Sequence, residues 1–187
     1  MKQALRLLAL AILGVTIAAC TGGTPSASTQ APPNETAIDA LNRGLELHRA
    51  GKLYEATVAY FQSLAKEPAN QFAFYNLGLI AQQTQKTTIA ESYYRIALDI
   101  DPKFASPLYN LAILRHNAGA YTEVVSLYRR LLEIEPSNAN AHYNLALALR
   151  ALGQRTDADA EFARARQLDS RLVPPTGSES PRPTATR

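Results

Sequence analysis

The stretch Phe74-Tyr75-Asn76-Leu77-Gly78 decides how this chain folds, because close copies of it recur at a fixed interval. Moving 34 residues along gives Leu108-Tyr109-Asn110-Leu111-Ala112, and moving 34 again gives His142-Tyr143-Asn144-Leu145-Ala146. Further positions keep the same interval: Pro68, Pro102 and Pro136; Asn42, Asn76, Asn110 and Asn144; Ala56, Ala90, Val124 and Ala158; Tyr60, Tyr94, Tyr128 and Phe162. A period of this length is typical of stacked units that bury their apolar faces only against their neighbours.

Each unit has the pattern of two helices. Two runs of about 14 residues place their apolar residues at helical spacing. Gly51, Gly119 and Gly153 stand where the first helix of a unit ends, because glycine readily adopts the left-handed conformation there. Each repeated proline follows an acidic residue and closes the second helix. The sequence therefore predicts a helix-turn-helix unit repeated four times.

The stretch 74–78, followed by Ala90, Tyr94, Ala97 and the pair Asp101-Pro102, resembles the tetratricopeptide repeat. The resemblance implies an all-α fold, a right-handed α-solenoid of four such repeats. It extends over residues 37–172, divided into the repeats 37–70, 71–104, 105–138 and 139–172. Three departures stand out, namely Gln85 in place of the turn glycine, Val124 in place of alanine and Ser170 in place of proline.

The first residues of the chain have the pattern of an export signal. Lys2 and Arg6 precede a 13-residue apolar run, Leu7–Ala19, which is too short to cross a bilayer as a helix. The junction Ile17-Ala18-Ala19-Cys20 resembles the bacterial lipobox, which implies a signal peptide over residues 1–19 and a diacylglyceryl and N-acyl lipid on Cys20. A plain secretory signal with an incidental cysteine is the alternative. Cys20 is the only cysteine, and acylation would consume a thiol that is otherwise exposed.

The lipid anchor would place the protein in the cell envelope without a membrane-spanning helix. Thr21 follows the cysteine where lipoproteins kept at the inner membrane have aspartate, so the resemblance favours the periplasmic face of the outer membrane. In a cell with a single membrane, the outer face of that membrane is expected instead. Residues 20–36 are predicted to form a flexible linker and residues 173–187 a disordered tail, because both are rich in small polar residues and proline.

The charge balance argues against nucleic acid as a partner. Removing residues 1–19 takes Lys2 and Arg6 from the 19 basic residues, leaving 17 against 16 acidic residues. So small a net charge predicts no strong attraction to nucleic acid or to anionic lipid. Membrane contact is expected through the lipid anchor alone.

The concave face of a tetratricopeptide array is its usual ligand surface, and the resemblance places three rows of residues there. An amide side chain can both donate and accept hydrogen bonds, as the backbone of an extended peptide does. The same amides are frequent in the family without a bound peptide, and tyrosines at these positions also serve packing alone. The predicted binding residues of the first two rows are Asn42, Asn76, Asn110 and Asn144, with Tyr75, Tyr109 and Tyr143 one residue earlier.

One helical turn further on, large aliphatic residues form a third row. They indicate an apolar ligand segment or a docked helix, unless neighbouring residues cover them. Beyond them a mildly basic rim could favour an acidic or C-terminal group. The row consists of Leu45, Leu79, Ile113 and Leu147, and the rim of His48, Arg49, His116 and Arg150, with Gln82, Gln83 and Asn117 between them.

Two sharper hypotheses are rejected on the sequence. The chaperone-binding members of the family clamp a carboxylate with lysine and arginine, but the corresponding places hold Leu41, Ser106 and Asn110. Catalysis finds no support either, because no zinc spacing, phosphate loop or nucleophile elbow is present. His48 and His116 should lie roughly 16–20 Å apart across one intervening helix, too far to share a metal ion. The protein is expected to be no enzyme and to need no cofactor beyond the lipid on Cys20.

The function predicted from the sequence is a lipid-anchored envelope scaffold that binds a protein or an extended peptide in its groove. Such lipoproteins resemble those that assist pilus, secretin, outer-membrane or cell-wall machinery. Two alternatives stay open. One is a module that senses small amphiphiles or unfolded peptides, and the other is a homo-oligomer formed through the apolar edge at Leu168, Leu172 and Val173.

Overall fold

The computed structural model describes residues 34–175. The predicted signal peptide, Cys20, residues 21–33 of the linker and residues 176–187 of the tail lie outside the described residues. Residues 34–175 contain helices and no strand, which confirms the predicted all-α fold. No helix among them has the length and the apolar composition needed to cross a membrane.

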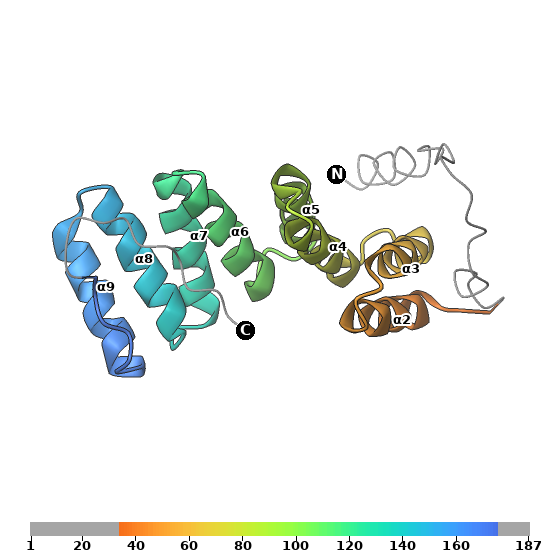
Figure 1. Ribbon diagram of the computed structural model, residues 1–187. Coiled ribbons are helices and arrows are strands. Elements are labelled where there is room, and N and C mark those ends of the chain that lie inside the picture. The colour runs from red at the N-terminus through yellow and green to blue at the C-terminus, as the bar shows by residue number, and fades with distance from the viewer. Residues whose placement is uncertain (1–33, 176–187) are drawn as a thin grey trace. The chain divides into compact units, whose positions relative to one another are not determined.

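The described helices belong to two compact units (Figure 1). The first unit ends at Ile100 and the second begins at Asp101. The first contains α2 (Ala37–Arg49), α3 (Leu53–Lys66), α4 (Gln71–Gln83) and α5 (Thr87–Ile100). The second contains α6 (Ala105–Asn117), α7 (Tyr121–Ile134), α8 (Ala139–Ala151) and α9 (Arg155–Leu168).

Consecutive helices pack in pairs, as the repeat pattern predicts. In the first unit α2 packs on α3 and α4 on α5, and α4 also contacts α2 and α3. In the second unit α6 packs on α7 and α8 on α9, with α7 also against α8. The repeated aromatic position forms the centre of each pair, because Tyr60, Tyr94 and Tyr128 are fully buried and Phe162 is 3% exposed. The repeated aromatic residue thus lies on the inner face of the second helix of each of these pairs.

The ends of the helices follow from particular residues. Asn70 and Asn138 cap α4 and α8, because each side chain accepts a hydrogen bond from the backbone three residues later. The turns after α2, α6 and α8 use the three predicted glycines, with φ between 74° and 78°. After α4 the same place holds Gln85, which adopts φ 60° without being glycine.

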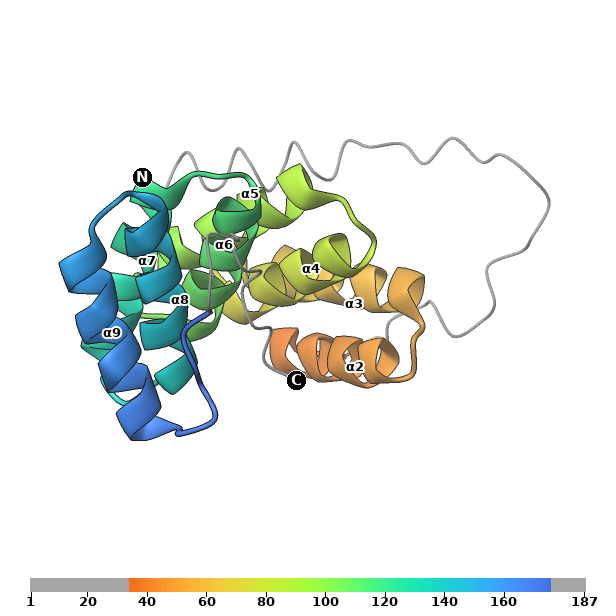
Figure 2. The same ribbon diagram turned by 60° about the vertical axis from the view of Figure 1, so that its left-hand side comes forward.

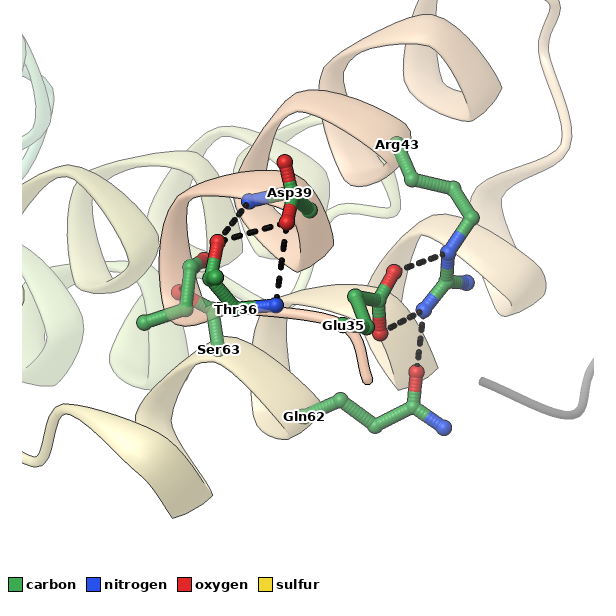
Figure 3. A network of polar contacts seen from close by, with 7 residues as sticks. Glu35, Thr36, Asp39, Arg43, Gln62 and Ser63 are labelled. Atoms are coloured by element: carbon green, nitrogen blue, oxygen red, sulfur yellow. Dashed lines mark hydrogen bonds and ion pairs between the residues drawn. The ribbon is translucent and has the colours of Figure 1, made fainter. Parts of the chain in front are cut away.

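The N-terminal boundary of the folded part differs from the sequence expectation. The predicted linker extends to residue 36, but Glu35 is 7% exposed and forms an ion pair with Arg43 of α2 at 2.8 Å. Arg43 also donates to Gln62 of α3, and Thr36 forms a capping box with Asp39 (Figure 3). Folded structure therefore begins before residue 37, because an arginine on α2 provides a partner for the one carboxylate of the linker.

The C-terminal boundary differs in the same direction. The predicted tail begins at residue 173, yet the backbone carbonyls of Val173 and Pro175 accept hydrogen bonds from Tyr143 and Arg150 of α8. After the chain leaves α9, residues 173–175 run back beside α8 (Figure 2). A stretch rich in proline lacks backbone donors, but its carbonyl oxygens are still available to side chains of a neighbouring helix.

Candidate functional site

In the first unit, five predicted groove residues from two helices line one cavity of about 350 Å³. They are Leu45, His48 and Arg49 of α2 with Asn76 and Gln83 of α4. These residues share a face because α2 and α4 are the first helices of consecutive repeats and contact each other directly. The cavity combines an aliphatic side chain, two amides and two basic groups, which together can contact both the backbone and the side chains of a peptide.

The polar walls of this cavity are partly fixed by hydrogen bonds. The Nε2 atom of His48 lies 3.2 Å from Oε1 of Gln83, so this pair links the rim of α2 to the rim of α4. Asn76 donates to the carbonyl of Phe72, one turn earlier on its own helix, at 2.7 Å. That bond uses one of the two amide donors of Asn76 and holds its side chain in one orientation. Hydrogen bonds therefore hold the side chains of His48, Gln83 and Asn76 in this cavity.

The row of four asparagines is not uniform. Asn42 is exposed and Asn110 half-buried, whereas Asn76 is 8% exposed and Asn144 fully buried. The amide of Asn144 donates to the hydroxyl of Tyr109 at 3.2 Å, which joins α8 to α6 inside the second unit. In this structure the amide of Asn144 is a packing group, while that of Asn76 lines the cavity.

The row of tyrosines packs against the repeated aromatic position. The ring of Tyr75 lies 5.9 Å from Tyr94, that of Tyr109 lies 5.8 Å from Tyr128, and that of Tyr143 lies 5.3 Å from Phe162. The last two contacts are edge-to-face, a favoured geometry for aromatic pairs. Tyr109 is buried, and Tyr75 and Tyr143 are half-buried, so a ligand could reach only part of each ring.

The aliphatic row and the rim also differ between the units. Leu45 and Leu79 are half-buried, whereas Ile113 is 8% and Leu147 3% exposed. His116 is 6% exposed with its ring edge-to-face against Tyr121, and burial lowers its pKa. Its imidazole is therefore largely uncharged at neutral pH. An apolar surface accessible to a ligand thus occurs at this row in the first unit.

A second cavity, which the sequence did not indicate, lies in the second unit. Its volume is about 610 Å³, and α7 lines it together with the turn from α8 to α9 and the first turn of α9. Charges of both signs line it, among them Arg129, Arg130, Glu133 and Asp157. Mixed charges on the outer faces of helices give no periodic signal, which explains why the repeat pattern did not reveal this cavity. Among residues 34–175 no cluster of histidine, cysteine and carboxylate side chains could hold a metal ion.

Comparisons with known proteins agree with this helical arrangement. A family model of the tetratricopeptide repeat matches residues 73–104, and a second family model, of the TPR repeat, matches residues 115–153. No curated protein sequence matches the chain. Repeats of this type serve protein–protein interaction, with a concave surface as binding face.

Solved structures share the fold at low sequence identity. A crystal structure of MamA aligns with a TM-score of 0.65 at 18% identity, over 72% of this chain and 79% of that chain. MamA from Desulfovibrio magneticus RS-1 gives 0.65 at 19% identity, over 72% and 76% of the two chains. MamA AMB-1 gives 0.64 at 24% identity, over 74% and 79%. With its two family matches and its paired helices, this chain is a tetratricopeptide-repeat protein.

Proposed function

We propose that this protein is a lipid-anchored adaptor of the cell envelope that binds an extended segment of a partner protein between α2 and α4. The observation that supports the proposal is the cavity where Leu45 and Arg49 of α2 come together with Asn76 of α4. Its volume of about 350 Å³ is at the lower end of the range for ligand sites, which suits a short segment. The protein would act by binding and would catalyse no reaction.

The chemistry of the cavity limits what such a segment can be. Leu45 provides apolar contact for one side chain of the ligand, and the amide of Asn76 can bond to its backbone. Arg49 and His48 lie at the same rim, so an acidic side chain or a C-terminal carboxylate is favoured over a basic group. The expected ligand is a peptide of mixed apolar and acidic character.

The first experiment uses a photo-crosslinking amino acid at Gln83, which is exposed at the rim of the cavity. The matched control places it at Asp99, an exposed residue of α5 that does not line the cavity. We expect one dominant protein adduct at position 83, and we expect Arg49→Ala to weaken it at least several-fold. Glu46→Gln, an exposed change on the same helix outside the cavity, should leave it unchanged.

The other outcomes favour other functions. An adduct at position 99 with none at 83 would move the binding surface away from the α2/α4 cavity. Adducts with lipid or fatty acid alone would favour the amphiphile-sensing alternative, and adducts with a second copy would favour self-association. Any of these three results contradicts the adaptor proposal.

The envelope location is tested separately. Cells are fed an alkyne-tagged fatty acid, and the chain is compared with its Cys20→Ser variant. Label on the parent chain alone would support acylation of Cys20, and fractionation of the labelled chain would then distinguish the outer from the inner membrane. Equal labelling of both chains, or of neither, would contradict the anchor while leaving the cavity proposal intact.

A further inference from the structure

The chain reverses its direction directly after α9. Asp169 ends the helix in an extended conformation, and the backbone N–H of Leu172 donates to its carbonyl at 3.1 Å. The guanidinium of Arg171 donates to both carboxylate oxygens of Asp169, at 2.9 Å and 2.8 Å. These bonds fold residues 169–172 into a tight turn. The hydrogen bonds that Arg171 donates to the Asp169 carboxylate from its side chain and from its backbone lower the pKa of Asp169 to about 2. The turn directs the following residues back toward α8 (Figure 2).

Two side chains of α8 contact the returning segment. The hydroxyl of Tyr143 donates to the carbonyl of Val173 at 3.3 Å. Two nitrogens of the Arg150 guanidinium donate to the carbonyl of Pro175, each at 3.2 Å. Tyr143 and Arg150 are two helical turns apart, so the segment follows the helix from its first half to its last turn.

The hydrogen bonds from α8 to the segment all reach its backbone. Val173 is 62% exposed, so its side chain contributes little to the contact with α8. Pro174 and Pro175 have no backbone N–H and can only accept hydrogen bonds, and both donors on α8 meet a carbonyl oxygen of the segment, that of Val173 or that of Pro175. Proline also restricts the free segment to extended conformations, which lowers the entropy lost when it binds.

The donors stand in the rows that the sequence predicts to bind a ligand. Tyr143 is equivalent to Tyr75 and Tyr109, and Arg150 to Gln82 and His116. Tyr143 is held by its edge-to-face contact with Phe162, and Arg150 lies half-buried near the end of α8. The segment therefore occupies, within its own chain, the position that these rows offer to an extended peptide.

We infer that the α8 surface formed by Tyr143 and Arg150 is a binding site for extended segments of the type X-Pro-Pro, and that residues 173–175 occupy it as an internal competitor. An external segment of the same chemistry binds only after the protein's own segment leaves. This site lies within the second unit and is independent of the α2/α4 cavity. It gives the C-terminal segment a regulatory role instead of a passive one.

The test measures binding of a dye-labelled peptide with the sequence of residues 170–175, acetylated and amidated at its ends. The full chain is compared by fluorescence anisotropy with a chain that ends at Leu172, both purified in mild detergent. A short tether holds a segment at an effective concentration in the millimolar range, so we expect about tenfold tighter binding by the shortened chain. Equal affinities for the two chains would overturn the inference.

Variants of the donors show whether the peptide binds at α8. In the shortened chain, Tyr143→Phe removes only the hydroxyl and keeps the ring on Phe162, and it should weaken binding a few-fold. Arg150→Lys keeps the charge but loses the planar fork, and it should weaken binding more. Arg164→Gln, an exposed change on α9, should leave the affinity unchanged. Unaltered affinity in both donor variants would contradict the assignment to α8.

A further variant covers the case in which the shortened chain does not fold, as judged by circular dichroism. Pro174→Gly with Pro175→Gly in the full chain keeps the segment but makes it more flexible, which weakens the internal contact. The full chain with these two changes should bind the external peptide several-fold more tightly than the parent. No gain in affinity would overturn the inference without any truncation.

Discussion

Gly44 of α2 and Tyr60 of α3 approach so closely that a methyl group on Gly44 would lie 2.5 Å from Cε1 of the tyrosine ring. One repeat later Gly78 and Tyr94 have the same relationship. In the second unit alanine takes the place of this glycine: Ala112 is paired with Tyr128, and Ala146 with Phe162. The first unit thus needs glycine at this place to bring its helices together, whereas the second accommodates alanine.

Replacing Gly44 with alanine should destabilise the protein although alanine is the better helix former. The buried ring of Tyr60 would have to move, and overpacking of this kind costs about 1–3 kcal/mol, more than the ~1 kcal/mol gained in helix propensity. Urea unfolding followed by circular dichroism measures the difference. Ala112→Gly is the matched reverse change, and it should also destabilise, by about 1 kcal/mol or more. A stabilised Gly44→Ala variant would show that the ring can shift at little cost.

Replacing Gln85 with glycine should stabilise the first unit. Gln85 has φ 60°, a conformation that costs a residue with a side chain about 1–2 kcal/mol and glycine very little. Because glycine also loses more entropy on folding, the expected gain is about 0.5–1 kcal/mol. Thermal unfolding checks it, with Gly119→Gln as the reverse change at the equivalent turn of the second unit. Loss of stability at position 85 would mean that the glutamine side chain offsets its backbone strain.

Removing a hydroxyl from the repeated aromatic position should have different effects in neighbouring repeats. The hydroxyl of Tyr94 donates to Oε1 of Gln82 at 2.7 Å, so Tyr94→Phe should cost about 1 kcal/mol. The buried hydroxyl of Tyr60 has no hydrogen-bond partner within residues 34–175, and burial raises its pKa to about 12. Tyr60→Phe should therefore be neutral or slightly stabilising. Unfolding free energies of the two variants give the comparison, and equal losses would contradict it.

Breaking the contact between Glu35 and Arg43 should loosen the N-terminal boundary of the first unit. Arg43→Met keeps much of the side-chain length but leaves the Glu35 carboxylate, which is 2% exposed, without its ion pair. Hydrogen bonds to a charged group contribute about 1.5–3 kcal/mol, and we expect a loss in that range. Glu46→Gln, an exposed change on the same helix, should stay within about 0.5 kcal/mol of the parent. Limited proteolysis should cut near residue 35 faster in Arg43→Met than in the control.

The stability of the second unit should decrease as the pH falls below neutrality because of His116. Burial lowers the pKa of His116 below its ordinary value of 6.5. As the pH falls through 6.5, the unfolded chain therefore binds a proton at His116 while the folded chain still does not. The unfolded state therefore gains from protonation as the pH falls through 6.5. The stability difference between the parent and His116→Phe, measured between pH 7.5 and 5, should shift in favour of the variant. A difference that stays constant over this range would contradict the assignment.

The sequence predicted the helix pairs because each of them repeats the same residues at the same spacing. Tyr60, Tyr94 and Tyr128 are fully buried, and Gly51 has the left-handed conformation that the turn was expected to need. The turn conformation depends on the local sequence, and the burial of the tyrosines depends on the neighbouring helix. A 34-residue period contains both the turn and the neighbouring helix, so it predicts both properties. The fold could therefore be predicted without any knowledge of side-chain geometry.

The candidate site was predictable only in part. Asn76 and Asn144 hold equivalent positions in the repeat, so the sequence predicts the same role for both. In the structure Asn76 lines a cavity, whereas Asn144 is fully buried and bonds to Tyr109. The difference arises because Tyr109 supplies an acceptor for the Asn144 amide, a contact between helices that no spacing encodes. Glu35 and Pro175 were missed for the same reason, since their partners are single arginines on neighbouring helices.

The carbonyl contacts of Val173 and Pro175 have a consequence for how the C-terminal segment tolerates mutation. Because the exposed side chain of Val173 contributes little to the contact, substitutions that keep the extended backbone should be nearly silent there. An inserted or deleted residue in this segment would displace both oxygens from their donors at once. Position 173 can therefore diverge in composition while the length of the segment stays constrained, and a comparison of lengths would detect a constraint that a comparison of residues at position 173 overlooks.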